Sequence, residues 1–144
     1  MPPIRHDLPR AGVDPIDGAG PALRMLHVLI DEPRRPQTLA LLLDEARRGL
    51  GVLVVDGTHR PDSVLDVARV LAEAAPQHPR LRAVALASVR PGPQPADMIL
   101  DDVDRWADLD DILTEASVEL VEWFVVGDPA VSCPRDLLGA PARW

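Results

Sequence analysis

Residues 83–106 read AVALASVRPGPQPADMILDDVDRW, and this stretch decides the fold that the sequence predicts. The apolar run 83–89 has the length and composition of a buried β-strand. It stops at Arg90, and the three prolines that follow closely stiffen the loop. Over residues 101–116 an acidic segment has apolar residues at helical spacing, namely Trp106, Leu109, Leu113 and Ala116. A strand, a stiff loop and a helix in this order are a common layout at the edge of a functional site.

The flanking segments alternate between predicted strands and predicted helices. Apolar runs predict strands over residues 26–31, 51–56 and 118–126, and periodic apolar positions predict helices over 37–48 and 62–75. This order predicts a three-layer α/β domain with a mixed or mostly parallel central sheet, for instance of the doubly wound kind. The side chains expected in its core are Leu53, Val55, Val84, Leu86, Leu120 and Phe124.

Local signals support the first helix and the strand after it. Pro36 suits a helix start, and Gly49 suits a helix end. The apolar positions between them, at i, i+3, i+4 and i+7, are Leu39, Leu42, Leu43 and Ala46. The continuous apolar run 51–56 is typical of a strand covered on both faces.

Residues 1–22 are expected to form a flexible, proline-rich N-terminal arm, because five prolines and three glycines interrupt any apolar periodicity. Residues 23–144 then form a single α/β domain of ordinary size. Removal of residues 1–20 is expected to change the melting temperature by a degree or two at most, since little apolar surface there can be buried.

Composition narrows the partners and the compartment. The formal net charge is −8, so phosphate backbones are unfavourable partners and nucleic acid is not expected to bind. No apolar run has the length of a membrane span, and no signal-peptide pattern is present. A single cysteine, Cys133, suits a reducing cytoplasm, which is the expected location.

Three short motifs have a structural explanation that we prefer to a chemical one. The Asp-Gly-Thr at 56–58 resembles the phosphatase loop of the haloacid dehalogenases, but Val54 stands where that loop needs its nucleophilic Asp. Asp101, Asp102 and Asp104 favour a helix N-terminus, and the acidic run 101–111 lacks the glycine and glutamate of a calcium loop. Cys133 precedes Pro134, which opens a short turn of helix, and no basic histidine can be assigned to it.

The stretch around the proline loop resembles the metal-binding segment of the JAB/MPN (JAMM) domain, in the version carried by the RadC family. That family has the pattern His-x-His-Pro-x-Gly-x-Pro-x-x-Ser-x-x-Asp, in which both His and the Asp bind zinc. Aligned without a gap, the zinc ligands fall on Ser88, Arg90 and Asp101, and the prolines of the pattern fall on Pro91 and Pro95.

The flanks agree with this resemblance over roughly residues 51–139. The family has an upstream Gly-Thr, here Gly57-Thr58, and a later segment similar to ELVEWFVVGD, here residues 119–128. Two features depart from it. The family has strands where the periodicity here predicts the helix 37–48, and its catalytic Glu has no clear counterpart in this chain.

The resemblance implies a site that has lost its chemistry, because Ser88 is a poor zinc ligand and Arg90 is a permanent cation. The first hypothesis is therefore a non-catalytic JAB/RadC-like domain without a cofactor, which binds a protein partner or itself through a surface formed by Ser88, Arg90, Pro91 and Asp101. Arg90 is expected to pair with Asp101.

Two alternatives remain open. One is a metal-dependent hydrolase with rearranged ligands such as Asp101, Asp104 and His59, and only this alternative would use zinc. The other is a small doubly wound α/β domain that binds a ligand at the ends of its strands.

Overall fold

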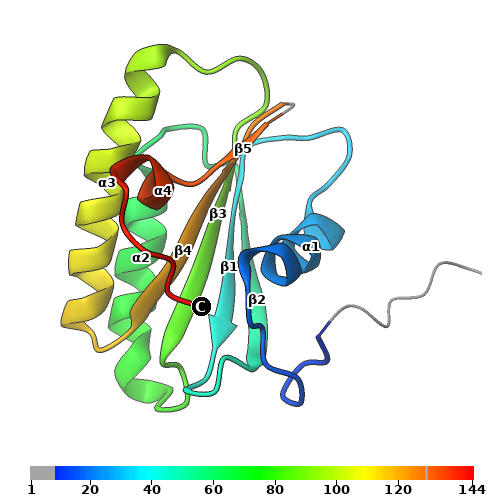
Figure 1. Ribbon diagram of the computed structural model, residues 1–144, viewed down its shortest axis with the longest axis vertical. Helices are drawn as coiled ribbons and strands as arrows, with labels where there is room; N and C mark the ends of the chain where they lie inside the picture. The colour runs from blue at the N-terminus through cyan, green and yellow to red at the C-terminus, as the bar shows by residue number, and fades with distance from the viewer. Residues whose placement is uncertain (1–8, 129) are drawn as a thin grey trace, which may run out of the picture.

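The computed structural model describes residues 9–128 and 130–144, and at its centre lies a mixed sheet in the order β2-β1-β3-β4-β5 (Figure 1). β3 and β4 run parallel, and the other neighbouring strands are antiparallel. The strands are β1 Gln37–Leu43, β2 Gly49–Asp56, β3 Ala83–Val89, β4 Glu119–Val126 and β5 Val131–Ser132.

Helices cover both faces of the sheet and complete the three layers that the sequence predicts. α2 and α3 pack on one face, and α1 packs on the other (Figure 1). The helices are α1 Ala19–Leu29, α2 Ser63–Ala74 with the 3-10 turn η2 Ala75–Gln77, α3 Ala96–Glu115 and α4 Pro134–Leu138. The fold is thus α/β with a mixed sheet, as expected.

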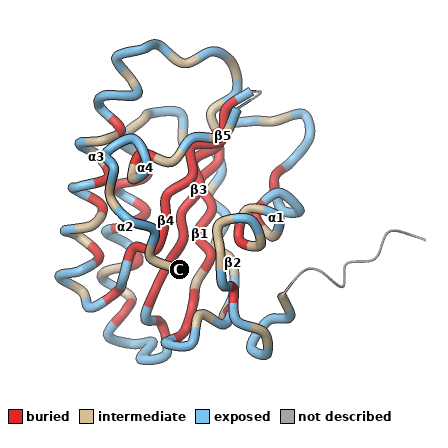
Figure 2. The backbone as a smooth tube through the Cα atoms, viewed as in Figure 1, coloured by how far each residue is buried: buried red, intermediate tan, exposed pale blue. Residues whose placement is uncertain are grey.

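Two hydrophobic cores lie on the two faces of the sheet, and β3 contributes to both. Its seven residues are all buried (Figure 2). Val84 and Leu86 pack toward α2 and α3, and Ala85 and Ala87 pack toward α1. Successive side chains of a strand point to opposite faces, so a continuous apolar run is what a strand between two helical layers requires.

The helix predicted over 37–48 is wrong, because these residues form β1 and the turn of the β1–β2 hairpin. β1 is buried on both faces, so its leucines need no alternation and mimic a helical repeat by chance. The turn is fixed by Asp44, whose carboxylate accepts hydrogen bonds from the main-chain N–H groups of Ala46 and Arg48, both at 2.9 Å. Ala46, assigned to the apolar stripe, is exposed in that turn.

The strand predicted over 26–31 is also wrong, since Leu26 to Leu29 belong to α1. Ala22 and Leu26 lie four residues apart and are both fully buried, which is the spacing of one helix face. Val28 is exposed on the opposite side of the helix.

β2 is present where the sequence predicts it, but it is not covered on both faces. It is the outermost strand, and Leu53 and Val55 are only partly buried. The other predicted core residues, Val84, Leu86, Leu120 and Phe124, are buried.

The expected flexible arm is wrong for residues 9–22, and residues 1–8 lie outside the described part of the chain. Ile16 is fully buried against the α1 side of the sheet. Its N–H donates to the carbonyl of Arg47 at 2.8 Å, and the N–H of Gly12 donates to the carbonyl of Gly49 at 2.9 Å. Among the prolines and glycines, one isoleucine and two main-chain bonds are enough to dock the segment.

Candidate functional site

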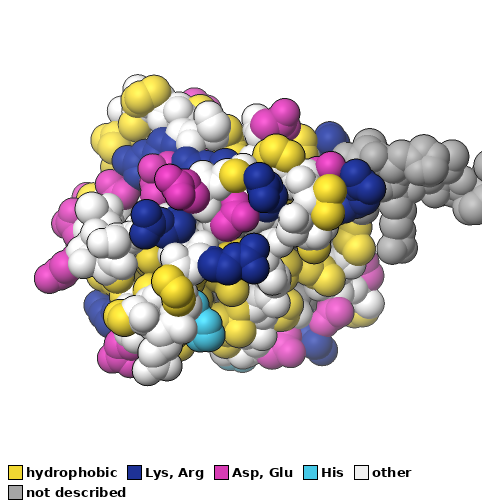
Figure 3. Space-filling view, turned by 90° about the horizontal axis from the view of Figure 1, so that it is seen from below, with side chains coloured by type: hydrophobic (Ala, Val, Ile, Leu, Met, Phe, Trp, Pro, Cys, Tyr) yellow, Lys and Arg dark blue, Asp and Glu magenta, His cyan; other side chains and the backbone are white. Residues whose placement is uncertain are grey.

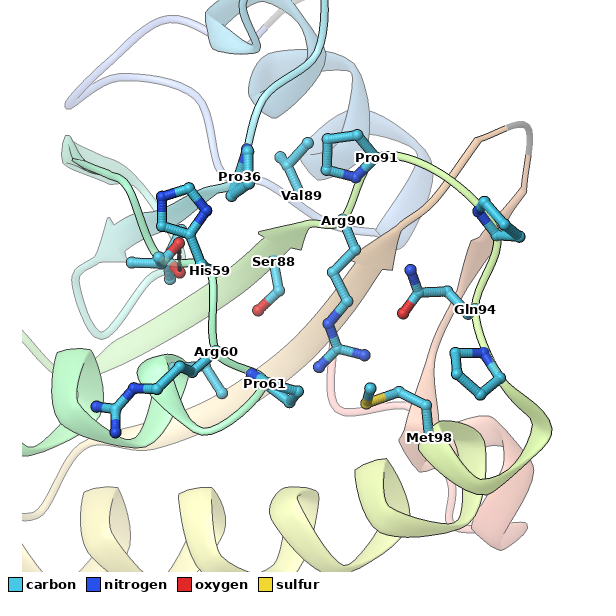
Figure 4. Close-up of a pocket in the computed structure, with 15 residues that line it drawn as sticks. Pro36, His59, Arg60, Pro61, Ser88, Val89, Arg90, Pro91, Gln94 and Met98 are labelled. Atoms are coloured by element: carbon cyan, nitrogen blue, oxygen red, sulfur yellow. Dashed lines mark hydrogen bonds between the residues drawn. The ribbon is translucent and has the colours of Figure 1, made fainter.

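A pocket of about 320 Å³ opens where β3 ends, and it includes most of the predicted site (Figure 4). Ser88 and Arg90 come from the end of β3, and the loop after β2 faces them with His59 and Pro61. The proline loop and the first turn of α3 close the third side. The lining residues are Pro36, Thr38, Thr58, His59, Arg60, Pro61, Val64, Ser88, Val89, Arg90, Pro91, Pro93, Gln94, Pro95 and Met98.

Arg90 forms a bidentate ion pair within the site. Its Nη1 and Nη2 atoms donate to the two carboxylate oxygens of Asp102 at 2.7 and 2.9 Å. The side chains of Arg90 and Asp102 are only 12% and 6% exposed. Parallel N–H···O bonds to a carboxylate are the strongest geometry available to a guanidinium, so this pair is held in a fixed orientation.

The indole of Trp123 ties this pair to the sheet. The guanidinium carbon of Arg90 lies 5.7 Å from the centre of the Trp123 ring, within the range of a cation–π interaction. The indole N–H donates to the hydroxyl oxygen of Ser88 at 3.0 Å. Ser88 is therefore a buried hydrogen-bond acceptor, and Trp123 has both its ring face and its N–H satisfied.

A second arginine extends the network to the start of α2. Arg105 donates to Asp102 at 3.0 Å and to Asp62 at 2.8 Å. The hydrogen bond from Arg105 holds the pKa of Asp62 below its ordinary value. Asp102 thus receives hydrogen bonds from two guanidinium groups, which compensates for its burial.

The predicted partner of Arg90 is wrong by one residue. Asp101 is exposed to solvent, and the neighbouring Asp102 makes the ion pair. The sequence contains a signal for this, because Asp102 shares a helix face with the buried Trp106, Leu109 and Leu113. A carboxylate at such a position must be paired, and Arg105 one turn along the helix and Arg90 at the end of β3 both reach it.

The residues at the implied zinc positions do not fit the metal. Zinc needs three donors with lone pairs and an open position for water. Ser88 already accepts the indole hydrogen bond, and Arg90 offers only N–H donors and a positive charge. Among the described residues, no group of three or more His, Cys, Asp or Glu side chains is placed to hold a metal ion, so Asp101, Asp104 and His59 are not brought together as one.

The Asp-Gly-Thr motif is a turn whose threonine lines the pocket. Gly57 has a φ of 76°, a left-handed conformation that suits glycine. The Thr38 hydroxyl donates to the Thr58 hydroxyl at 3.0 Å and joins the loop to β1. The same pocket is lined by Ser88 and by several prolines, of which Figure 4 labels Pro36, Pro61 and Pro91.

Cys133 lies away from this pocket and is suited to packing rather than to nucleophilic chemistry. Burial and the nearby Glu122 raise the pKa of its thiol to about 12. A thiol with that pKa is protonated near neutral pH, and the protonated form is a poor nucleophile.

Charges of both signs are mixed over the face of the molecule that Figure 3 shows. Looking at the lower end of the sheet, Figure 3 shows arginine side chains interspersed with acidic ones and no continuous basic face. Within residues 9–128 and 130–144, none of the helices is long and apolar enough to cross a lipid bilayer. Comparison of the chain with protein-family models gives no match, and comparison with curated proteins gives none either.

Proposed function

We propose that this chain is a non-catalytic domain of JAB/RadC-like type that binds a protein partner through the pocket at the end of β3. One observation carries the proposal. The Arg90 guanidinium, buried between Asp102 and Trp123, occupies the position at which the resemblance implies a zinc ligand. A fixed cation at this point repels a metal ion and removes the means of activating water.

One feature of the fold supports the resemblance. The family has strands where the periodicity of residues 37–48 favours a helix, and β1 with the hairpin turn lies there. The Asp position of the zinc motif does not fit without an adjustment, because the ungapped motif places it on the exposed Asp101 whereas Arg90 pairs with Asp102. If the proline loop is one residue longer than the motif, Asp102 takes that position and Arg90 keeps the position of the second His.

The lining of the pocket favours an extended peptide segment as the bound part of the partner. Proline rings at the rim have few conformations to lose on binding, which lowers the entropic cost of association. Thr58 and Ser88 line the pocket and each keeps a hydroxyl proton that it can donate to the main chain of such a segment. The net charge of −8 disfavours nucleic acid, and the single cysteine favours a cytoplasmic setting.

The volume of about 320 Å³ favours a second candidate, a small ligand, because it falls at the lower end of ordinary ligand pockets. A ligand of this kind would be enclosed by the same residues. It would raise the melting temperature of the purified protein when added alone, whereas a protein partner must be supplied as a macromolecule.

Two measurements test the proposed function. Elemental analysis of the purified protein should find far less than one zinc per chain, and stoichiometric zinc would contradict a non-catalytic site. Affinity capture should then be compared among the wild type, a Thr58→Trp variant that fills the pocket, and an Arg80→Ala control. A partner retained by the wild type and the control but lost from Thr58→Trp supports the proposal. Identical capture by all three chains contradicts it.

A further inference from the structure

The two margins of the sheet are protected to very different extents. At the β4 margin, β5 pairs with Val125 and Val126, and Arg143 donates to the carbonyl of Leu120 at 3.0 Å. At the β2 margin, residues 12–16 bond only to Arg47 and Gly49. Beyond Gly49, no strand of the described chain pairs with the outer edge of β2 (Figure 1).

The register of the hairpin identifies the main-chain groups that lie free. The N–H of Gly57 donates to the carbonyl of Pro36, so this pair faces inward across the hairpin. In an antiparallel ladder every second residue bonds to the same neighbour, so Gly51, Leu53 and Val55 also bond to β1. The N–H and C=O groups of Val52 and Val54 therefore point away from the sheet.

The outer edge of β2 lacks the features that usually keep an edge strand from pairing with a strand of another molecule. Such strands usually carry a charge, a proline or a covering segment. Residues 49–55 read GLGVLVV, with no charge and no proline, and the side chain of Val54 is 41% exposed. Beside them, between β2 and α2, an apolar groove of about 270 Å³ ends at Val70, which is 59% exposed.

We propose that β2 pairs antiparallel with β2 of a second copy of this chain, so that one sheet runs through a two-fold dimer. The free peptide groups of Val52 and Val54 can form a ladder with another strand edge, and each copy offers the same strand. The charges at the two ends of the free segment favour antiparallel pairing and a second copy of this chain as the partner. Arg48 precedes the free segment and Asp56 ends it, so antiparallel pairing brings the Arg48 end of one copy toward the Asp56 end of the other.

Both ends are suited to this contact. Arg48 is exposed and has no ion-pair partner among the described residues. The side chain of Asp56 is 59% exposed beside Arg35, so it can accept a further cation. Parallel pairing would instead place Asp56 next to its own copy, where like charges repel. The proposal uses a different edge of the sheet from the β3 pocket and does not depend on the function proposed for that pocket.

Sedimentation velocity of the full chain from 1 to 100 µM tests the proposal. The wild type should form a dimer of twice 15.6 kDa. Val54→Lys places a charge at the centre of the contact and should raise the dissociation constant at least 100-fold. Val54→Pro should do the same, since it removes an N–H that β1 does not use. Leu100→Lys is the matched control, because Leu100 is 72% exposed on α3, and it should dimerise like the wild type.

Arg48→Glu should weaken the dimer at least tenfold, and circular dichroism should confirm that each variant is folded. Three results would overturn the proposal. The first is a wild type that stays monomeric at 100 µM. The second is a dimer that survives both Val54 variants or is unaffected by Arg48→Glu. The third is open-ended association, because a two-fold contact between β2 strands uses the same edge in both copies and closes at the dimer.

Discussion

Arg90 is a nearly buried cation within the candidate site. It provides a positive charge between Ser88 and Asp102, fixed by two hydrogen bonds and an aromatic ring. A guanidinium has no lone pair and no exchangeable coordination position, so it cannot lower the pKa of a bound water. The pair can hold the surrounding loops in place, and this role is measurable as stability.

Asp102→Asn should lower the free energy of unfolding by about 3 kcal/mol, because it leaves Arg90 and Arg105 buried without their shared carboxylate. Asp101→Asn is the matched control on the next, exposed residue and should change stability by less than about 0.5 kcal/mol. Urea denaturation measures both. Equal effects of the two variants would mean that Asp102 is not the buried partner.

Cys133 should react slowly with iodoacetamide at pH 8, because its pKa is raised from 9.0 to about 12 and little thiolate is present. The rate should rise sharply once urea unfolds the chain. Alkylation of the folded protein at the rate of a free cysteine would contradict the buried setting.

The same thiol predicts a pH effect on stability. Between pH 9 and 12 the unfolded chain loses the thiol proton while the folded chain keeps it, so stability should fall as the pH rises through that window. Below pH 9 the thiol is protonated in both states and contributes no slope. A Cys133→Ser variant should lack this part of the alkaline loss, and equal pH profiles for the two proteins would count against the shift.

At the scale of the elements, the sequence correctly predicts the helices and strands whose apolar pattern fits only one type of secondary structure. β3, β4 and α2 lie where expected, and α4 ends at Gly139 with a φ of 79°. β1 was missed because a strand buried on both faces gives no alternation, and a run of leucines also satisfies a helical period. The docking of Ile16 was missed because it depends on a tertiary contact with the hairpin that no local pattern encodes.

Ile16→Ala should lower the free energy of unfolding by about 2–5 kcal/mol, the usual cost of emptying a fully buried aliphatic position. Val13→Ala in the same segment is the control, and it should change little because Val13 is 55% exposed. Chemical denaturation of both variants decides the matter. An Ile16→Ala variant with the same free energy of unfolding as the wild type would indicate that residues 9–22 are only loosely attached.

Ser117→Gly should stabilise the protein by about 0.5–1 kcal/mol, since Ser117 ends α3 with a φ of 62° and glycine adopts that conformation without strain. Its N–H bonds to the carbonyl of Thr114, and the main chain of glycine keeps that bond. Ser132→Gly in β5 is the comparison and should not stabilise. A loss of stability in Ser117→Gly would show that the side chain contributes more than its backbone strain costs.

At the scale of the whole molecule, the site lies where the topology concentrates strand ends and loops. The parallel pair β3 and β4 brings Ser88 beside Trp123, and the crossover helix α3 returns Asp102 to Arg90. The sequence alone predicts that Ser88, Arg90 and Pro91 contribute to one surface where the strand 83–89 ends. It could not place Trp123, because that contact depends on the register between two strands far apart in the chain.

A variant with restored zinc ligands tests the proposal that Arg90 stands where the resemblance implies a zinc ligand. The measurement is a zinc titration, followed by melting temperature and by equilibrium dialysis, of the wild type and of a Ser88→His/Arg90→His variant. The double variant should bind one zinc with Asp102 as third ligand and be stabilised by about 2.7 kcal/mol at a hundredfold excess over the dissociation constant. The wild type should not respond, and adding Asp102→Asn to the double variant should abolish binding. Zinc binding by the wild type, or a double variant that ignores zinc, would contradict the account.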